Sequence, residues 1–186
     1  MFESLLSKRA WKMALRALFS GKKHATWIGL YEIECRDKDG NLLWSEVAQN
    51  ALADEGEQSM LDGYLRAQNI PTTFYLGLFN DTPVETDTMA DLTGESAGTY
   101  GYARQEIERS VVGWPMLAMD SGDYMATSKQ VTFSATGGSW GPVTYMVLTT
   151  TASGTAGKLI AYVALSQSRT LQDTETIGCI IKVKQQ

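Results

Sequence analysis

Two acidic residues, Glu106 and Glu108, are the side chains best suited to catalysis by type and spacing. Glycoside hydrolysis uses a pair of carboxylates. Period-two alternation along a predicted strand over 100–109 places both acids on one face, and it places Tyr102 and Arg104 there as well. Neighbouring acids on one strand face usually point to water, because burying unpaired charge is costly. We therefore expect a solvated surface rather than a glycan hydrolase, and we predict that the chain is not an enzyme.

The other groups that could act as nucleophiles or metal ligands are scattered. His24 is the single histidine, and the two cysteines, Cys35 and Cys179, do not form a CxxC pair. Zinc needs three or four nitrogen or sulfur ligands close together, so we predict no metal site and no cofactor. The segment 154–159 is similar to a phosphate-binding loop, but Leu159 stands where Ser or Thr is required. We expect both cysteines to be free thiols in the core.

Two aromatic residues, Trp140 and Tyr145, could stack on a sugar or a base. Trp140 follows a glycine-rich turn, and an aromatic side chain in that position is more often structural. The polar loop 80–99, rich in Thr, Asp and Gly, is a further candidate surface, because loops of this length are usually functional or flexible. These features keep open a carbohydrate- or receptor-binding module.

Charge divides the chain into two parts. The net charge is −5, and residues 1–24 carry six basic residues and one acid, a net charge of +5. The other residues carry ten basic and twenty acidic side chains, a net charge of −10. A basic arm on an acidic body favours docking to an acidic partner, which is the body of a neighbouring copy, nucleic acid or a membrane surface. We divide the chain into an arm, 1–24, and one body domain, 25–186.

The arm shows the periodicity of an amphipathic helix over 1–20, with Gly21 as its stop. The arm residues that we expect to bind a partner are Phe2, Leu6, Lys8, Arg9, Trp11, Lys12, Met13 and Arg16. The apolar stripe is equally consistent with packing on the protein's own body. A membrane-surface helix has the same signature, but Ala supplies much of the stripe, so we predict no membrane association. Charges interrupt every apolar run, and no secretory signal is predicted.

The body shows period-two alternation in short segments separated by turn residues, which is typical of a β-sandwich. The strands are expected over 26–35, 42–47, 74–80, 100–109, 131–133, 143–148, 159–165 and 177–183. Residues 111–120 are expected to form a turn or a bent edge segment. The predicted fold is mainly β: an antiparallel, jelly-roll-like β-sandwich with one packed helix and the basic N-terminal arm.

The packed helix is expected over 51–68, with Asn50 as its N-cap. Two glycines, Gly56 and Gly63, lie in its interior and cost about 1 kcal/mol each relative to Ala. We expect them to let the helix approach a neighbouring sheet closely. The apolar face of the helix is expected to consist of Leu52, Met60, Leu61, Tyr64 and Leu65.

A series of short motifs in the second half of the chain resembles a family of small bacteriophage virion proteins, often labelled tail-fibre-like or minor structural proteins. The motifs, in order, are Tyr75–Phe79, Thr82-Pro83, Gly101–Gln105, Val131–Phe133, Trp140–Thr144 and the closing stretch from Gly157 to Lys184. The resemblance covers about 70–184. One departure is Gln172-Asp173-Thr174, where the family pattern often has a Gly-Asp turn.

The resemblance implies a structural virion component in a tail, neck or head position. Its implied partners are other virion proteins, and its implied location is the virion, assembled in the host cytoplasm. We expect a homo-oligomer built through sheet edges and the N-terminal arm. Nucleic acid is a less favoured partner of the arm, and the carbohydrate-binding module stays the alternative function.

Overall fold

The computed structural model describes residues 27–185, so the predicted arm, 1–24, lies outside the described residues. The elements in chain order are β1 (Trp27–Arg36), β2 (Leu42–Gln49), β3 (Ala51–Leu52), α2 (Asp54–Leu61), the π-helix η1 (Asp62–Arg66), β4 (Thr73–Phe79), β5 (Gln105–Glu108), β6 (Met116–Asp120), β7 (Asp123–Thr127), β8 (Val131–Ser134), β9 (Trp140–Thr149), β10 (Leu159–Leu171) and β11 (Thr176–Gln185).

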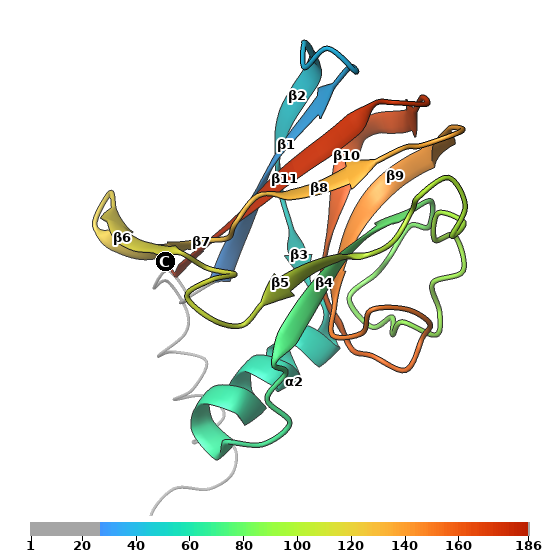
Figure 1. Cartoon of the computed structure of the whole chain (residues 1–186). Coiled ribbons are helices and arrows are strands. Elements are labelled where there is room, and N and C mark those ends of the chain that lie inside the picture. Colours follow the sequence, from blue (N-terminus) through green and yellow to red (C-terminus); the bar gives the residue numbers. More distant parts are fainter. Residues whose placement is uncertain (1–26, 186) are drawn as a thin grey trace, which may run out of the picture.

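The strands form two antiparallel sheets that face each other (Figure 1). Sheet A has the strand order β2-β1-β11-β7-β6, and β8 pairs with the first half of β11, before the point where β7 begins to pair with it. Sheet B has the order β3-β10-β9-β4-β5. The first and last described strands are neighbours, because Trp27 of β1 is in register with Gln185 of β11.

The main core lies between the two sheets and follows the alternation of the strands. In β1 the side chains of Tyr31, Ile33 and Cys35 are buried, and in β11 those of Ile177 and Cys179 are buried with them. Leucine, valine and aromatic side chains from β4, β9 and β10 complete the same cluster from sheet B. This arrangement confirms the predicted antiparallel sandwich, in which the apolar faces of both sheets are removed from water.

The helix begins later and ends earlier than predicted. Ala51 and Leu52 pair with β10 as the short strand β3, and Ala53 is the N-cap without a side-chain hydrogen bond. Asn50 is not the cap, because its Oδ1 accepts the backbone N–H of Gly29 at 2.8 Å. A side chain committed to a contact 21 residues away cannot satisfy the free N–H groups at the start of α2.

The packing face of the helix is also different from the prediction. Gly56 is buried against β10, where an added Cβ would lie 2.0 Å from the carbonyl oxygen of Ile160. This confirms the expected close approach at Gly56, whereas Gly63 has only an ordinary contact at 3.7 Å. The helix packs through small residues, so its larger apolar side chains point away: Leu61 is 59% exposed and Leu65 is 70% exposed.

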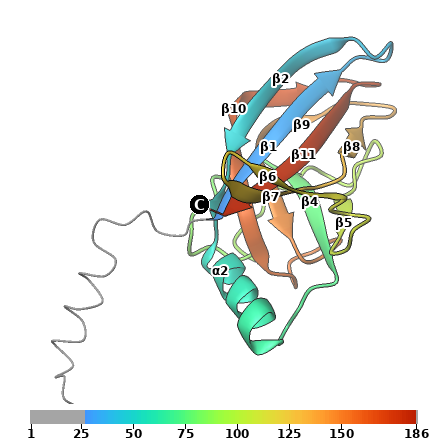
Figure 2. The ribbon, with the colours of Figure 1, turned by 90° about the vertical axis from the view of Figure 1, so that its left-hand side faces the viewer.

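The segment 111–120, expected to be a turn or a bent edge segment, ends in β6, which forms a hairpin with β7 at the edge of sheet A (Figure 2). The strand β7 was not predicted. β7 pairs with the last residues of β11, and β6 pairs with β7 alone. Both faces of β6 are exposed, although it contains Met116, Leu117 and Met119. No helix in the part of the chain that the structure describes is long and apolar enough to cross a membrane.

Candidate functional site

The two acids considered for catalysis lie on β5, which is shorter than the predicted strand. Glu106 is exposed and Glu108 is half-buried, where it accepts a hydrogen bond from the Ser110 hydroxyl at 3.1 Å. Tyr102 and Arg104 were expected on the same solvated face as the two acids, but both are buried. Within residues 27–185 no three His, Cys, Asp or Glu side chains are grouped to hold a metal ion. The acids therefore lie on a surface and do not form a pocket.

The two cysteines are free and buried, as predicted. Burial raises the pKa of the Cys35 thiol to about 11, and it raises the pKa of Cys179 as well. A thiol with a raised pKa is a poor nucleophile near neutral pH, because the thiolate is the reactive form. Both side chains belong to the core between the sheets.

Trp140, expected as a possible ligand-facing residue, lies in the core with 4% of its surface exposed. Its indole N–H donates to the carbonyl oxygens of Thr99 at 3.2 Å and Tyr100 at 3.1 Å. The ring meets Tyr102 edge-on, with 5.5 Å between the ring centroids. The indole therefore holds the end of the 80–99 loop from inside and offers no free face to a sugar.

Tyr145, the other candidate, is half-buried on the outer face of sheet B. Its ring lies 6.5 Å from that of Tyr162 on β10. Burial raises the pKa of Tyr162, and the nearby Glu85 and Asp87 raise it further. The sequence analysis did not single out Tyr162, because it considered only the alternate residues of this strand, which were expected to face the core.

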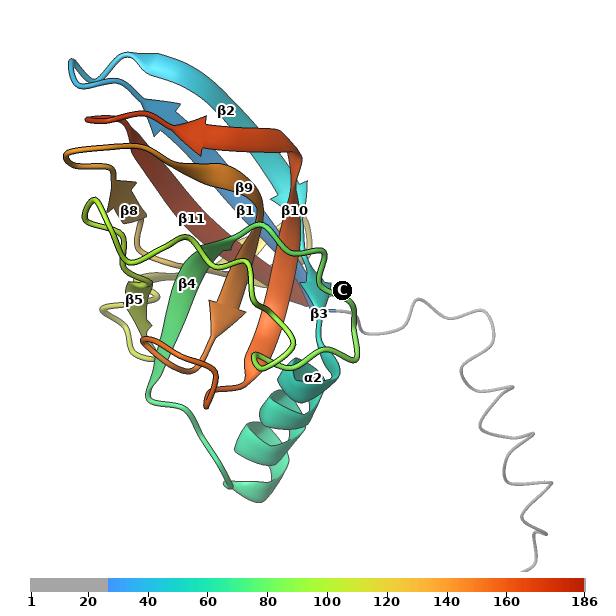
Figure 3. The same cartoon turned by 90° about the vertical axis from the view of Figure 1, so that its right-hand side faces the viewer.

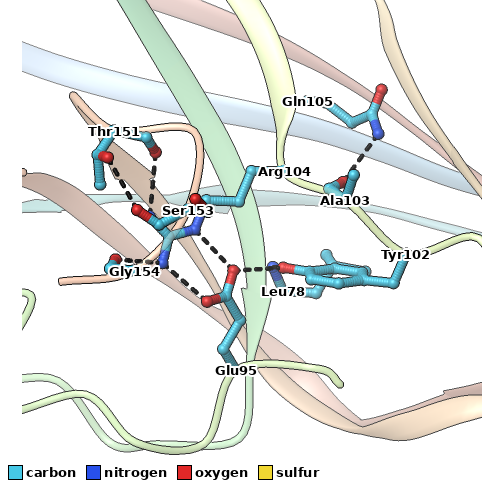
Figure 4. Close-up of polar contacts among 9 residues, drawn as sticks. All are labelled: Leu78, Glu95, Tyr102, Ala103, Arg104, Gln105, Thr151, Ser153 and Gly154. Carbon is cyan, nitrogen blue, oxygen red and sulfur yellow. Dashed lines mark hydrogen bonds and ion pairs between the residues drawn. The ribbon is translucent and has the colours of Figure 1, made fainter. Parts of the chain in front are cut away.

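A polar cluster fixes the long loop to the outer face of sheet B (Figure 4). We name Glu95, Tyr102 and Arg104 the loop anchor. The Arg104 side chain is 2% exposed, and its Nε and Nη2 donate to the two oxygens of Glu95 at 2.6 and 2.8 Å. The same guanidinium donates to the carbonyl oxygens of Thr151 and Gly154, both at 3.0 Å. One buried cation thus joins two loops that are distant in the sequence.

The hydroxyl of Tyr102 completes the loop anchor. It accepts the backbone N–H of Leu78 at 3.0 Å and donates to Glu95 at 3.0 Å. Burial raises the pKa of this phenol, so it stays protonated and keeps its donor. Gly77 lies beneath, where an added Cβ would lie 2.8 Å from the Phe79 ring. The strand therefore needs glycine at this position.

The loop itself covers an apolar surface. Met89 and Leu92 are buried against Phe79 and Val147 in a second, smaller core on the outer face of sheet B. Figure 3 shows the loop running across this face. The loop is not simply a solvated acidic segment, because two of its apolar residues are buried against the sheet.

An apolar groove opens at the end of the sandwich where β1 begins and β11 ends. Its volume is about 430 Å³, and helix α2 and the β6–β7 hairpin contribute to its walls. Its lining includes Met60, Phe74, Trp114, Leu117, Leu148 and Val183. We call this feature the apolar groove. Figure 1 shows the β6–β7 hairpin beside the end of β11, with α2 below the sheets.

The groove combines a buried polar group with an exposed apolar rim. Tyr31 is one of the lining residues; its side chain is fully buried, and its hydroxyl has no hydrogen-bond partner among the described residues. On the rim, Tyr64 is 90% exposed, Leu117 is 71% exposed and Tyr124 is 64% exposed. Apolar surface gathered around a concave feature marks an interaction site. Sequence reasoning missed it, because the pattern assigned Met60 and Tyr64 to a buried helix face.

The fold and these two features define the class of this chain: a two-sheet antiparallel β body with a fixed loop surface and an open apolar groove. The chain belongs to the family of the podophage GP4 fiber I protein gp80, whose family model matches residues 51–184. The match begins after the arm and the β1–β2 hairpin, and it includes α2. No curated protein matches the chain.

Membership of this family confirms the resemblance carried by the short motifs. It makes the chain a structural protein of a bacteriophage, of the tail-fibre-like kind, with a place in the virion among other virion proteins. The matched residues contain the loop anchor and most of the lining of the apolar groove. The arm lies outside them, together with β1 and β2.

Proposed function

We propose that this chain is a structural virion subunit that works by protein–protein assembly, and that its N-terminal arm docks to neighbouring virion subunits. The position in the particle is the tail, the neck or a head-attached accessory site. Assembly takes place in the host cytoplasm, and the chain acts without a cofactor and without turnover.

The distribution of charge carries this proposal. The arm has a net charge of +5 and the remainder a net charge of −10. Electrostatic complementarity of this kind steers association and suppresses wrong partners. The periodicity of 1–20 adds an apolar stripe that lies outside the residues matched by the family model, 51–184. A segment outside the family module, opposite in charge to it, is suited to adapt the module to its neighbours.

Deletion of Met1–Gly21 tests the arm. We expect the truncated chain to remain folded and to be absent from particles, because the body keeps its core and loses its docking segment. Incorporation is measured by mass spectrometry of purified particles, and folding by circular dichroism of the isolated protein. The matched control is the full chain with Leu42→Glu and Val47→Glu, two exposed positions on β2. Normal incorporation of the truncated chain would show that the arm has no such role.

A carbohydrate- or receptor-binding function is the second candidate, and one observation favours it. Tyr145 and Tyr162 form a half-buried aromatic pair beside the carboxylates of Glu85 and Asp87. Aromatic rings next to acids are suited to stack on a sugar and accept its hydroxyl hydrogens. A glycan array probed with the full chain tests this function, with Tyr145→Ala expected to remove any signal and Tyr64→Ala expected to leave it unchanged. Absence of any glycan signal would favour pure assembly.

A further inference from the structure

We propose that the apolar groove receives the N-terminal arm, residues 1–24, of a second copy of this chain. The inference rests on the proposed assembly function and names the occupant of one interface. It pairs two features whose binding partners are not yet assigned: the apolar groove in the body and the arm, which is predicted to be amphipathic and lies outside the described residues.

The groove has the chemistry of a helix-binding surface. Its lining is dominated by aliphatic and aromatic side chains, and its rim carries Leu117 and Tyr124, which are 71% and 64% exposed. An amphipathic helix binds such a groove through anchors spaced three and four residues apart. The arm offers Phe2, Leu6 and Met13 on one face of its predicted helix. Burying these anchors removes apolar surface from water on both partners.

The arm is attached close to the rim of the groove. The first described strand begins at Trp27, and two residues later Gly29 lines the groove opposite its partner in register, Val183. The point where the arm joins the body therefore lies beside the groove. A helix of twenty residues, as predicted for the arm, would extend about 30 Å, which is long enough to leave one copy and reach the same end of another.

Charge complementarity supports the same pairing. Helix α2, which contributes to the wall of the groove, carries two exposed acids, Asp54 and Glu57. Asp120 and Asp123 of the hairpin are already paired with Lys184, at 3.1 and 3.7 Å, and do not count toward this charge. The basic face of an arm seated in the groove would meet the acids of α2.

A second copy is favoured over the chain's own arm by the short link at the exit point. Residues 25 and 26 alone separate the arm from Trp27, where β1 begins. An arm that reversed into its own groove would have to turn within these residues. Docking in another copy needs no such turn, and it places a +5 segment between two bodies that otherwise repel.

Three full-chain variants with the same charge change test the contact. The groove variant carries Tyr64→Glu and Leu117→Glu, both at exposed positions of the groove lining, and the arm variant carries Leu6→Glu and Met13→Glu. The control variant carries Leu42→Glu and Val47→Glu, which are exposed on β2 away from the groove. Multi-angle light scattering after size exclusion should show an oligomer for the wild-type and control proteins. It should show the 20.4 kDa monomer for the groove and arm variants.

Mixing the groove variant with the arm variant distinguishes a second copy from the same chain. The first keeps an intact arm and the second an intact groove, so the mixture should form a two-chain complex that neither variant forms alone. A photo-crosslinker in place of Phe2 in the otherwise wild-type chain gives an independent readout. We expect a product of two chains, with the crosslink on residues 60–65 or 116–124. A monomeric wild-type protein, an assembled arm or groove variant, or a crosslink within one chain would overturn the inference.

These outcomes separate the inference from the proposed function. If the truncated chain fails to enter particles but the groove and arm variants stay assembled, the arm still has a docking role. Its binding site would then not be the groove of a second copy. Normal particle incorporation of the truncated chain would remove the docking role itself.

Discussion

Two apolar surfaces lie outside the main core, and only one of them is covered by the chain's own residues. On the outer face of sheet B, Phe79 and Val147 are covered by Met89 and Leu92 of the chain's own 80–99 loop. At the end of the sandwich, the apolar groove keeps an exposed rim that includes Leu117. The first surface is completed within one chain. The second leaves apolar area in water, which a soluble protein usually reserves for a partner.

The buried polar groups at the two surfaces also differ: those of the loop anchor are hydrogen-bonded, and the Tyr31 hydroxyl at the groove is not. The loop anchor satisfies its buried cation with four hydrogen bonds, two of them to Glu95 and two to backbone carbonyls of the 150–158 loop. In the groove, the Tyr31 hydroxyl has no partner among the described residues. A fully paired buried network fixes one conformation, whereas an unpaired buried group lowers stability. The loop surface of sheet B is therefore stabilised by contacts within the chain, whereas the apolar groove is suited to binding a partner.

The largest effect is expected from Glu95→Gln, which removes the charge facing Arg104. The guanidinium is 2% exposed, so it would remain buried without a counter-charge. Removing one partner of a buried ion pair costs about 3–5 kcal/mol, and we expect about 3 kcal/mol because Glu95 keeps some contact with water. The free energy of unfolding of the full chain in urea measures this loss.

The matched control for this variant is Glu34→Gln. Glu34 pairs with Arg36 at 2.8 Å, but the two side chains are 33% and 42% exposed. The hydrogen bond from Arg36 lowers the pKa of Glu34, yet a pair this exposed contributes no more than about 1 kcal/mol. Equal losses in the two variants would mean that the anchor is an ordinary surface pair, and the contrast between the two surfaces would be lost.

A smaller effect is expected at the wall of the groove from Gly56→Ala. The added methyl would lie 2.0 Å from the Ile160 carbonyl oxygen, so α2 must move away from β10. Overpacking costs about 1–3 kcal/mol, and the gain in helix propensity returns up to about 1 kcal/mol. We expect a net loss of about 2 kcal/mol in the free energy of unfolding, measured as for the ion pair.

Gly63→Ala is the control for the helix. Its added methyl meets only Ile70 Cγ1 at 3.7 Å, an ordinary contact. We expect no loss and a gain below about 1 kcal/mol, because Ala restricts the unfolded chain more than Gly. If both variants lost stability equally, close packing of α2 on sheet B would not be what positions the wall of the groove.

Local alternation was enough to predict the strands that form the core between the sheets, although β3, β6 and β7 were not predicted. Tyr31, Ile33 and Cys35 lie on one face of β1 and are buried, as the period of two predicts. Apolar residues of β11 follow the same period. These strands are buried on one face over most of their length, so the pattern reports their environment directly.

Features that depend on distant partners could not be predicted in this way. Arg104 is buried because Glu95 and two carbonyls of another loop meet it, and no local pattern encodes that meeting. Asn50 has the side chain of an N-cap but is used by Gly29. The apolar side of the helix points outward because Gly56 packs more closely on β10 than a larger residue would. In each case a long-range contact overrides a sound local preference.

The smallest effect contrasts two buried tyrosines, one at each surface. Tyr102→Phe removes a hydroxyl that accepts from Leu78 and donates to Glu95, and it leaves both groups without that partner. We expect a loss of about 1.5 kcal/mol in the free energy of unfolding. Tyr31→Phe removes a hydroxyl that has no partner among residues 27–185, so we expect no loss and a gain of up to about 1 kcal/mol.

Burial raises the pKa of both phenols, so both stay protonated at neutral pH and the comparison is between neutral groups. Urea denaturation of the two variants at pH 7 therefore measures hydrogen bonding and not charge. A loss at Tyr31 as large as that at Tyr102 would show that the Tyr31 hydroxyl is hydrogen-bonded in solution, and the contrast between the two hydroxyls would be lost.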